Sequence, residues 1–178
     1  GCLLYSGRSV AAHQSEAISR QGRMLRLMPT DLIKVLILCT GNSCRSIMAE
    51  ALLNELGQGR FQAWSAGSFP TGYVHPRVLE TLKRHGIDPG QPYSKSWNEF
   101  AAQPLDLVIT VCDQAAGETC PIFPGKPTKL HWGTPDPAKV LGNEAETQTA
   151  FDRAFYFLKE RIEQLVATSE HSEEVQDR

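Results

Sequence analysis

The feature that most constrains the fold is an apolar run at residues 32–38 that ends at a cysteine, Cys39. The run has the length and composition of a buried strand. A loop rich in Gly, Asn and Ser follows it, and then the helix-forming segment 48–53. The sequence therefore predicts a strand–loop–helix unit, in which the loop Cys-Thr-Gly-Asn-Ser-Cys-Arg-Ser occupies residues 39–46.

This loop has the right length to wrap a single anion. Five residues separate Cys39 from Arg45, and such a loop can point backbone N–H groups and a helix N-terminus inward. Arg45 can add a bidentate fork to two anion oxygens. The same positive field favours the nucleophilic thiolate of Cys39, so we expect a depressed pKa for this thiol. The other residues expected to bind the anion are Thr40, Gly41, Asn42, Ser43, Cys44 and Ser46.

Two backbone features of the loop support this interpretation. Gly41 can adopt positive φ, and Asn42 tolerates the left-handed region better than most residues. The Gly-Lys-Ser/Thr ending of a nucleotide P-loop does not occur in this loop, which makes an NTPase a poor interpretation. The pattern predicts a cysteine nucleophile aimed at a tetrahedral oxyanion.

Composition excludes several classes of protein. The chain has 178 residues, of which 41% are hydrophobic, and a net charge of −2, so we expect one domain of ordinary size and no nucleic-acid partner. No run of 18 apolar residues occurs, so no membrane span is predicted. Five cysteines, an odd number without a Cys-x2-Cys pair, indicate reactive thiols in a reducing, cytoplasmic compartment and no zinc or other metal site.

Strand and helix patterns alternate along the chain, which predicts an α/β fold with a parallel sheet in three layers. Residues 1–30 are expected to be a disordered extension, 31–167 the folded domain and 168–178 an acidic, disordered tail. The predicted strands are 32–38, 61–65, 105–111 and 129–132, and the predicted helices are 48–56, 75–85 and 151–166.

Residues Cys39–Glu50 (CTGNSCRSIMAE) resemble the active-site loop of the low-molecular-weight protein tyrosine phosphatases, and most closely that of the arsenate reductases built on the same scaffold. Three further segments match the arsenate reductase branch in order: Ser65-Ala66-Gly67, Val111-Cys112-Asp113 and His131-Trp132-Gly133-Thr134-Pro135-Asp136-Pro137. The resemblance covers about residues 32 to 166. It implies a four-stranded parallel sheet of order 2-1-3-4, with Cys39 and Cys112 ending neighbouring strands at the ligand-binding edge.

The resemblance also assigns roles. Asp136 lies between two prolines; spacing alone leaves a turn residue and a general acid equally open, and the resemblance implies the acid. Cys112 is implied as the thiol that attacks Cys39, and Cys120 could pass the oxidation outward or be a free thiol. The loop between Cys112 and Cys120 is one residue longer than in similar thioredoxin-coupled enzymes. The external reductant therefore stays open between thioredoxin, glutaredoxin with glutathione, and mycothiol, with no bound cofactor expected.

Lys95 is a second departure from the related enzymes. They place an aspartate beside the serine that matches Ser94, and use it with positions like Asn42, Glu50 and Ser65 to hold a monovalent cation. Lys95 brings its own charge to that place, so we predict that this chain binds no potassium. A lysine that is simply solvated is the alternative.

Three functions are compatible with these residues. Reduction of arsenate to arsenite through a Cys39 adduct is the leading hypothesis. A low-molecular-weight tyrosine phosphatase or phosphomonoesterase is the main alternative, since phosphate and arsenate share charge and shape. Ala138 and Lys139 follow Asp136-Pro137, where phosphatases of this type tend to place aromatic residues, and this weakens the alternative. A non-catalytic oxyanion-binding regulator is the third possibility. The presence of Cys39, Arg45 and Asp136 together argues against it.

Overall fold

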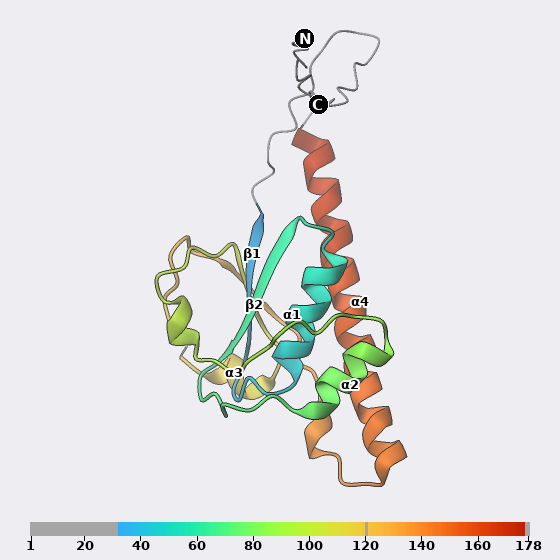
Figure 1. The fold of residues 1–178 in the computed structure, drawn as a ribbon. Coiled ribbons are helices and arrows are strands. Elements are labelled where there is room, and N and C mark those ends of the chain that lie inside the picture. The colour runs from blue at the N-terminus through green and yellow to red at the C-terminus, as the bar shows by residue number, and fades with distance from the viewer. Residues whose placement is uncertain (1–31, 120, 177–178) are drawn as a thin grey trace, which may run out of the picture. The chain divides into compact units, whose positions relative to one another are not determined.

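The computed structural model describes residues 32–119 and 121–176. Its centre is a sheet of four parallel strands in the order β2-β1-β3-β4 (Figure 1). The strands are β1 (Ile33–Cys39), β2 (Phe61–Gly67), β3 (Leu107–Thr110) and β4 (Thr128–His131). The predicted fold class, parallel pairing and strand order are confirmed.

The central strand β1 pairs with β2 and β3 along its two edges, and apolar clusters cover both of its faces. Val35 and Ile37 face one apolar cluster, and Leu36 and Leu38 face another. A strand covered on both sides needs apolar residues at every position, not at alternate positions. This explains the unbroken hydrophobic run that precedes Cys39.

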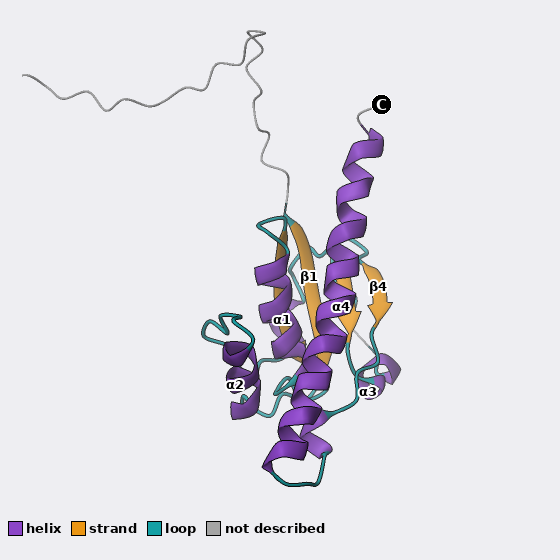
Figure 2. Cartoon of the chain, turned by 90° about the vertical axis from the view of Figure 1, so that its right-hand side faces the viewer, coloured by secondary structure: helices purple, strands orange, loops and turns teal. Residues whose placement is uncertain are grey.

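Helices cover one face of this sheet. They are α1 (Arg45–Leu56), α2 (Pro76–Arg84) and α4 (Glu144–Gln176), and α1 and α4 lie against the strands in Figure 2. The buried stripe of α4 consists of Phe151, Phe155, Leu158, Ile162 and Val166. The other face is covered by the short 3-10 helix η1 (Trp97–Phe100) and by loops, around Phe100 and Phe123.

Several boundaries differ from the prediction. β3 is shorter than the predicted strand 105–111. Two short helices were not predicted, because no periodic pattern in the sequence indicates them: α3 (Asp113–Gly117) and the 3-10 helix η2 (Pro137–Lys139). Helix α4 continues to Gln176, through most of the segment 168–178 for which the sequence predicts a disordered tail. Residues 1–30 and Cys120 lie outside the described residues. Within the described part of the chain, no helix is long and apolar enough to cross a bilayer.

Candidate active site

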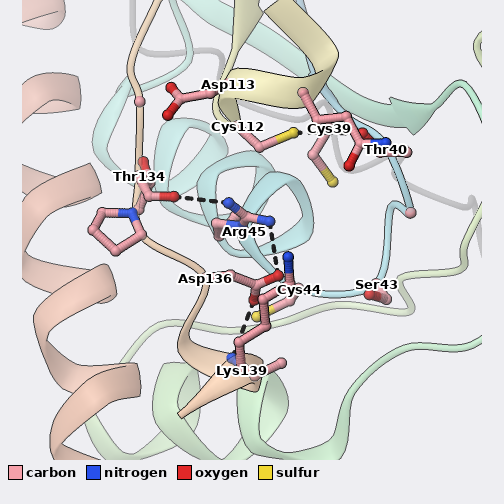
Figure 3. A pocket seen from close by; sticks show the side chains of 15 residues that line it. Cys39, Thr40, Ser43, Cys44, Arg45, Cys112, Asp113, Thr134, Asp136 and Lys139 are labelled. Atoms are coloured by element: carbon pink, nitrogen blue, oxygen red, sulfur yellow. Dashed lines mark hydrogen bonds and ion pairs between the residues drawn. The ribbon is translucent and has the colours of Figure 1, made fainter.

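The predicted loop lies at the carboxyl edge of the sheet, where β1 and β3 end side by side. It borders a cavity of about 500 Å³ that is also lined by Cys112, Asp136 and Lys139 (Figure 3). Asn42 adopts the left-handed conformation with φ of 43°, as the sequence predicts. Gly67 of β2 passes so close that a Cβ there would come within 2.4 Å of the Thr40 carbonyl oxygen. Any other residue at this position would displace the loop.

Cys39 is only 5% exposed, and two donors hold its sulfur. The Asn42 backbone N–H donates to Sγ at 3.2 Å, and Ser46 Oγ lies 3.0 Å from Sγ. Ser46 also accepts a bond from Asn42 Nδ2 at 2.9 Å. Its own hydrogen is therefore available to donate to the sulfur.

The pKa of Cys39 moves opposite to the prediction. Burial raises the pKa of the Cys39 thiol, and the hydrogen bonds from Ser46 and Asn42 only partly oppose this. The expectation of a depressed pKa is therefore wrong for this conformation. The physical reason is that desolvation penalises the thiolate, while the Arg45 guanidinium is engaged by other partners.

Arg45 is held by the segment that follows β4. Its Nη1 donates to the Thr134 carbonyl at 2.7 Å, and its Nη2 donates to Asp136 Oδ2 at 2.9 Å. Among the described residues, the buried Nε has no hydrogen-bond partner. The two hydrogen bonds use two of the five guanidinium N–H donors, so Nε and the second N–H of each Nη stay available to an anion.

Asp136 is placed as a turn residue and also lies at the cavity. Its Oδ1 accepts from the Ala138 N–H at 3.1 Å, so it caps η2 as a turn residue does. The carboxyl group also lines the cavity beside Arg45. The structure thus brings Cys39, Arg45 and Asp136 together around one cavity.

Cys112 lies at the same cavity and is 4% exposed. Its sulfur accepts from the Ala115 N–H at 3.4 Å and lies 3.7 Å from Thr40 Oγ1. Thr40 in turn donates to Glu118 Oε1 at 3.2 Å. Cys39 and Cys112 are both free thiols and interact electrostatically, so two sulfurs from neighbouring strands share one site.

Cys44 is also free and is buried within the loop. Burial and the nearby Asp136 raise the pKa of this thiol, which outweighs the lowering by Arg45. The thiol form is therefore strongly favoured, which is consistent with a structural role for this side chain. Cys120 is not among the described residues.

A polar network backs the loop on the side away from the cavity. Asn42 Nδ2 donates to Ser65 Oγ at 3.0 Å, and Ser65 donates to Glu50. The Lys95 ammonium lies 3.6 Å from Glu50 Oε2. No group of three or more His, Cys, Asp or Glu side chains arranged for a metal is found among the described residues, and the absence of bound potassium stays a prediction.

Sequence reasoning missed three residues of this site: Gly67, Thr134 and Glu118. Gly67 and Thr134 lie within segments that match the family, and the match assigned no role to either residue. Glu118 lies outside the segments that match the family, so no sequence pattern marked it as a site residue. Each acts through a contact with a residue far away in the chain.

Comparison with known families agrees with this geometry. Residues 34–177 match the family described as low molecular weight phosphotyrosine protein phosphatase. The chain belongs to this family. The predicted resemblance is thereby confirmed, and the low molecular weight phosphatase fold explains why the anion loop lies at the end of β1.

Relatives of this phosphatase family that match the chain include arsenate reductases. This chain is 36% identical over 134 residues to an arsenate reductase of Halalkalibacterium halodurans, and the match covers 75% of this chain and 95% of that protein. A solved arsenate reductase in the phosphate binding state has 30% identity and a TM-score of 0.65, covering 77% of this chain and 98% of its own. A thioredoxin-dependent arsenate reductase of Corynebacterium glutamicum has 26% identity and a TM-score of 0.59, over 82% and 65% of the two chains.

Proposed function

We propose that this chain reduces arsenate to arsenite, with Cys39 as the nucleophile and Cys112 as the thiol that resolves its adduct. The observation that carries this proposal is the pair of free thiols at one cavity that also holds Arg45 and Asp136. Hydrolysis of a phosphate ester needs one thiol and water. A second buried thiol at the same cavity is what a two-electron reduction requires.

In the first step, Cys39 Sγ attacks the arsenic atom of hydrogen arsenate held in the loop, while the thiol proton passes to an arsenate oxygen. A sulfur–arsenic bond forms, an arsenic–oxygen bond breaks, and Asp136 gives a proton to the oxygen, which leaves as water. Arg45 and the loop N–H groups stabilise the charge that spreads over the remaining oxygens. Asp136 must carry a proton for this step, which requires that its ion pair with Arg45 yields to the anion.

In the second step, the Cys112 thiolate attacks Cys39 Sγ. A disulfide forms, the sulfur–arsenic bond breaks, and its electron pair stays on arsenic, which leaves as arsenite. The cysteines are oxidised and arsenic(V) is reduced to arsenic(III). The N–H of Ala115 already donates to the Cys112 sulfur and holds it at the cavity.

An external thiol must then reduce the disulfide. We assign this to thioredoxin in the cytoplasm, supported by the thioredoxin-dependent relative from Corynebacterium glutamicum. Glutaredoxin with glutathione, or mycothiol, are the alternatives. Cys120 is proposed to carry the oxidation toward the surface, a role that depends on the loop after α3.

The test is arsenate-dependent NADPH oxidation, measured in parallel with thioredoxin and glutaredoxin systems, with arsenite quantified directly. The parent protein should turn over with at least one system, and Cys39→Ser should show none above background while keeping the far-UV spectrum of the parent. Turnover by Cys39→Ser would refute the assignment.

Phosphomonoester hydrolysis is the second candidate, and the family to which the chain belongs favours it. Cleavage of an aryl phosphate should be measured on the same preparations. The cavity is lined by Ala138 and Lys139 after the Asp-Pro pair, which offers no aromatic flank for a tyrosine ring. Efficient aryl phosphate cleavage without arsenate reduction would make this candidate the function.

A further inference from the structure

Lys95 is a buried lysine outside the cavity. Its side chain is 4% exposed, and lysine is almost never buried unless it is paired. Its ammonium lies 3.6 Å from Glu50 Oε2 and 3.3 Å from the Tyr93 carbonyl oxygen, with the Tyr93 ring centroid 4.4 Å away. No step of the proposed reaction uses this charge.

A continuous chain of contacts joins Lys95 to the nucleophile. Glu50 accepts from Ser65, which accepts from the Asn42 side chain. The backbone N–H of Lys95 also donates to Asn42 Oδ1 at 2.8 Å. Asn42 is thereby fixed at both ends of its amide, and its own backbone N–H donates to Cys39 Sγ.

Asn42 needs to be held because its backbone is in the left-handed region, with φ of 43°. A non-glycine residue pays for this conformation and keeps it only when its surroundings impose it. The Glu50 side chain is 20% exposed, and the Lys95 ammonium pairs with its Oε2. Without a cation beside it, the carboxylate would turn toward water and release Ser65.

We infer that Lys95 is a positioning residue for Cys39: its buried ammonium neutralises Glu50 and so holds the Asn42 backbone N–H against the Cys39 sulfur. The inference rests on the proposed role of Cys39 as the nucleophile but not on the identity of the substrate. Lys95 touches neither the cavity nor the reacting atoms, so it acts through Glu50 and Asn42.

The test measures the pH midpoint of iodoacetamide alkylation at Cys39, read by peptide mass spectrometry. Cys112 raises the pKa of this thiol, and the other titratable or charged groups that line the same cavity are Cys44, Arg45, Asp113, Asp136 and Lys139. None of them is changed. Three variants are compared with the parent: Lys95→Met, Glu50→Gln and the double variant, and Lys129→Met serves as the control because Lys129 is an exposed lysine on β4.

Lys95→Met should raise the Cys39 midpoint by about half a unit to one unit, because Glu50 loses its paired cation and the Asn42 N–H contact with the sulfur loosens. Glu50→Gln keeps an acceptor for Ser65 and should not raise it. The double variant, in which both buried charges are gone, should return most of the way to the parent midpoint. Lys129→Met should leave the midpoint where it is.

A parent-like midpoint in folded Lys95→Met, or an equal shift in Lys129→Met, would overturn the inference. If Lys95→Met does not fold, Lys95→Gln replaces it with the same expected rise, and a parent-like midpoint there would overturn the inference. The double variant should match Glu50→Gln, because Lys95 acts through Glu50, and a midpoint above that of Glu50→Gln would overturn this route. This readout needs no arsenate turnover. A failure of the proposed function, seen as activity in Cys39→Ser, is therefore distinct from a failure of the role given to Lys95.

Discussion

Replacing Cys112 by serine should stop steady-state arsenate reduction while leaving the shape of the site almost unchanged. Cys112 is 4% exposed, and its sulfur contacts the Ala115 N–H and the Thr40 hydroxyl. A serine oxygen is smaller but can accept and donate at the same place, so we expect the fold to survive. A hydroxyl cannot form a disulfide, so the variant lacks the internal electron pair that reduces arsenic.

The residual rate is that of an external thiol attacking Cys39. Since Cys39 is only 5% exposed, a dissolved thiol must enter the cavity without the positioning that the neighbouring strand provides. Loss of such positioning costs at least about 10³-fold, or about 4 kcal/mol in the activation free energy. We therefore expect arsenite production by Cys112→Ser to fall by at least that factor.

The assay follows arsenite release and aryl phosphate cleavage on the same preparation. Phosphate cleavage uses Cys39, Arg45, Asp136 and water, so it should stay within about threefold of the parent. Mass spectrometry of the parent after one turnover should find a disulfide that includes Cys112. Parent-like arsenate reduction by Cys112→Ser would refute the internal relay and require an external thiol to resolve the adduct directly.

Three further predictions concern single side chains. Asp136→Asn should lower kcat/KM for arsenate by about 10²- to 10³-fold through loss of the acid; a parent-like value in initial-rate kinetics would exclude that role. Because burial raises the pKa of Cys39, its alkylation midpoint should lie above about 8.5, and Ser46→Ala, which removes a lowering hydrogen bond, should raise it further; a midpoint well below that value would contradict the geometry. Burial raises the pKa of Asp152, but the hydrogen bonds from His85 and Arg84 lower it more. The net depression means that its contribution to stability is complete above the unfolded-state pKa and is lost as the pH falls through the folded-state pKa. Asp152→Asn should therefore lower the urea midpoint at pH 6, and this effect should shrink as the pH falls below the unfolded-state value of 3.8.

The structural place of Lys95 was only half visible in the sequence. Its position beside Ser94 indicated a charge near Asn42, Glu50 and Ser65, but a solvated lysine fitted the sequence equally well. The ammonium is instead buried against Glu50. Burial of a long charged side chain depends on what packs over it, and here that cover includes the Tyr93 ring from the same loop.

The sequence by itself determined the elements whose signal is local. The unbroken apolar run of β1, the small residues of the anion loop and the amphipathic stripe of α4 each reflect contacts within one segment or with one face. The matched motifs added the strand order and the identities of Cys39, Arg45 and Asp136. The local elements and the matched motifs depend on residues that lie near each other in the chain or within recognisable segments.

Only the tertiary structure decided the state of the site. The raised pKa of Cys39 comes from burial by surrounding elements, and the engagement of Arg45 comes from Thr134 and Asp136, some ninety residues away in the chain. The contact between Thr40 and Glu118 likewise joins segments with no shared sequence pattern. Desolvation and ion pairing are sums over neighbours in space, and a linear pattern does not contain those neighbours until the chain has folded.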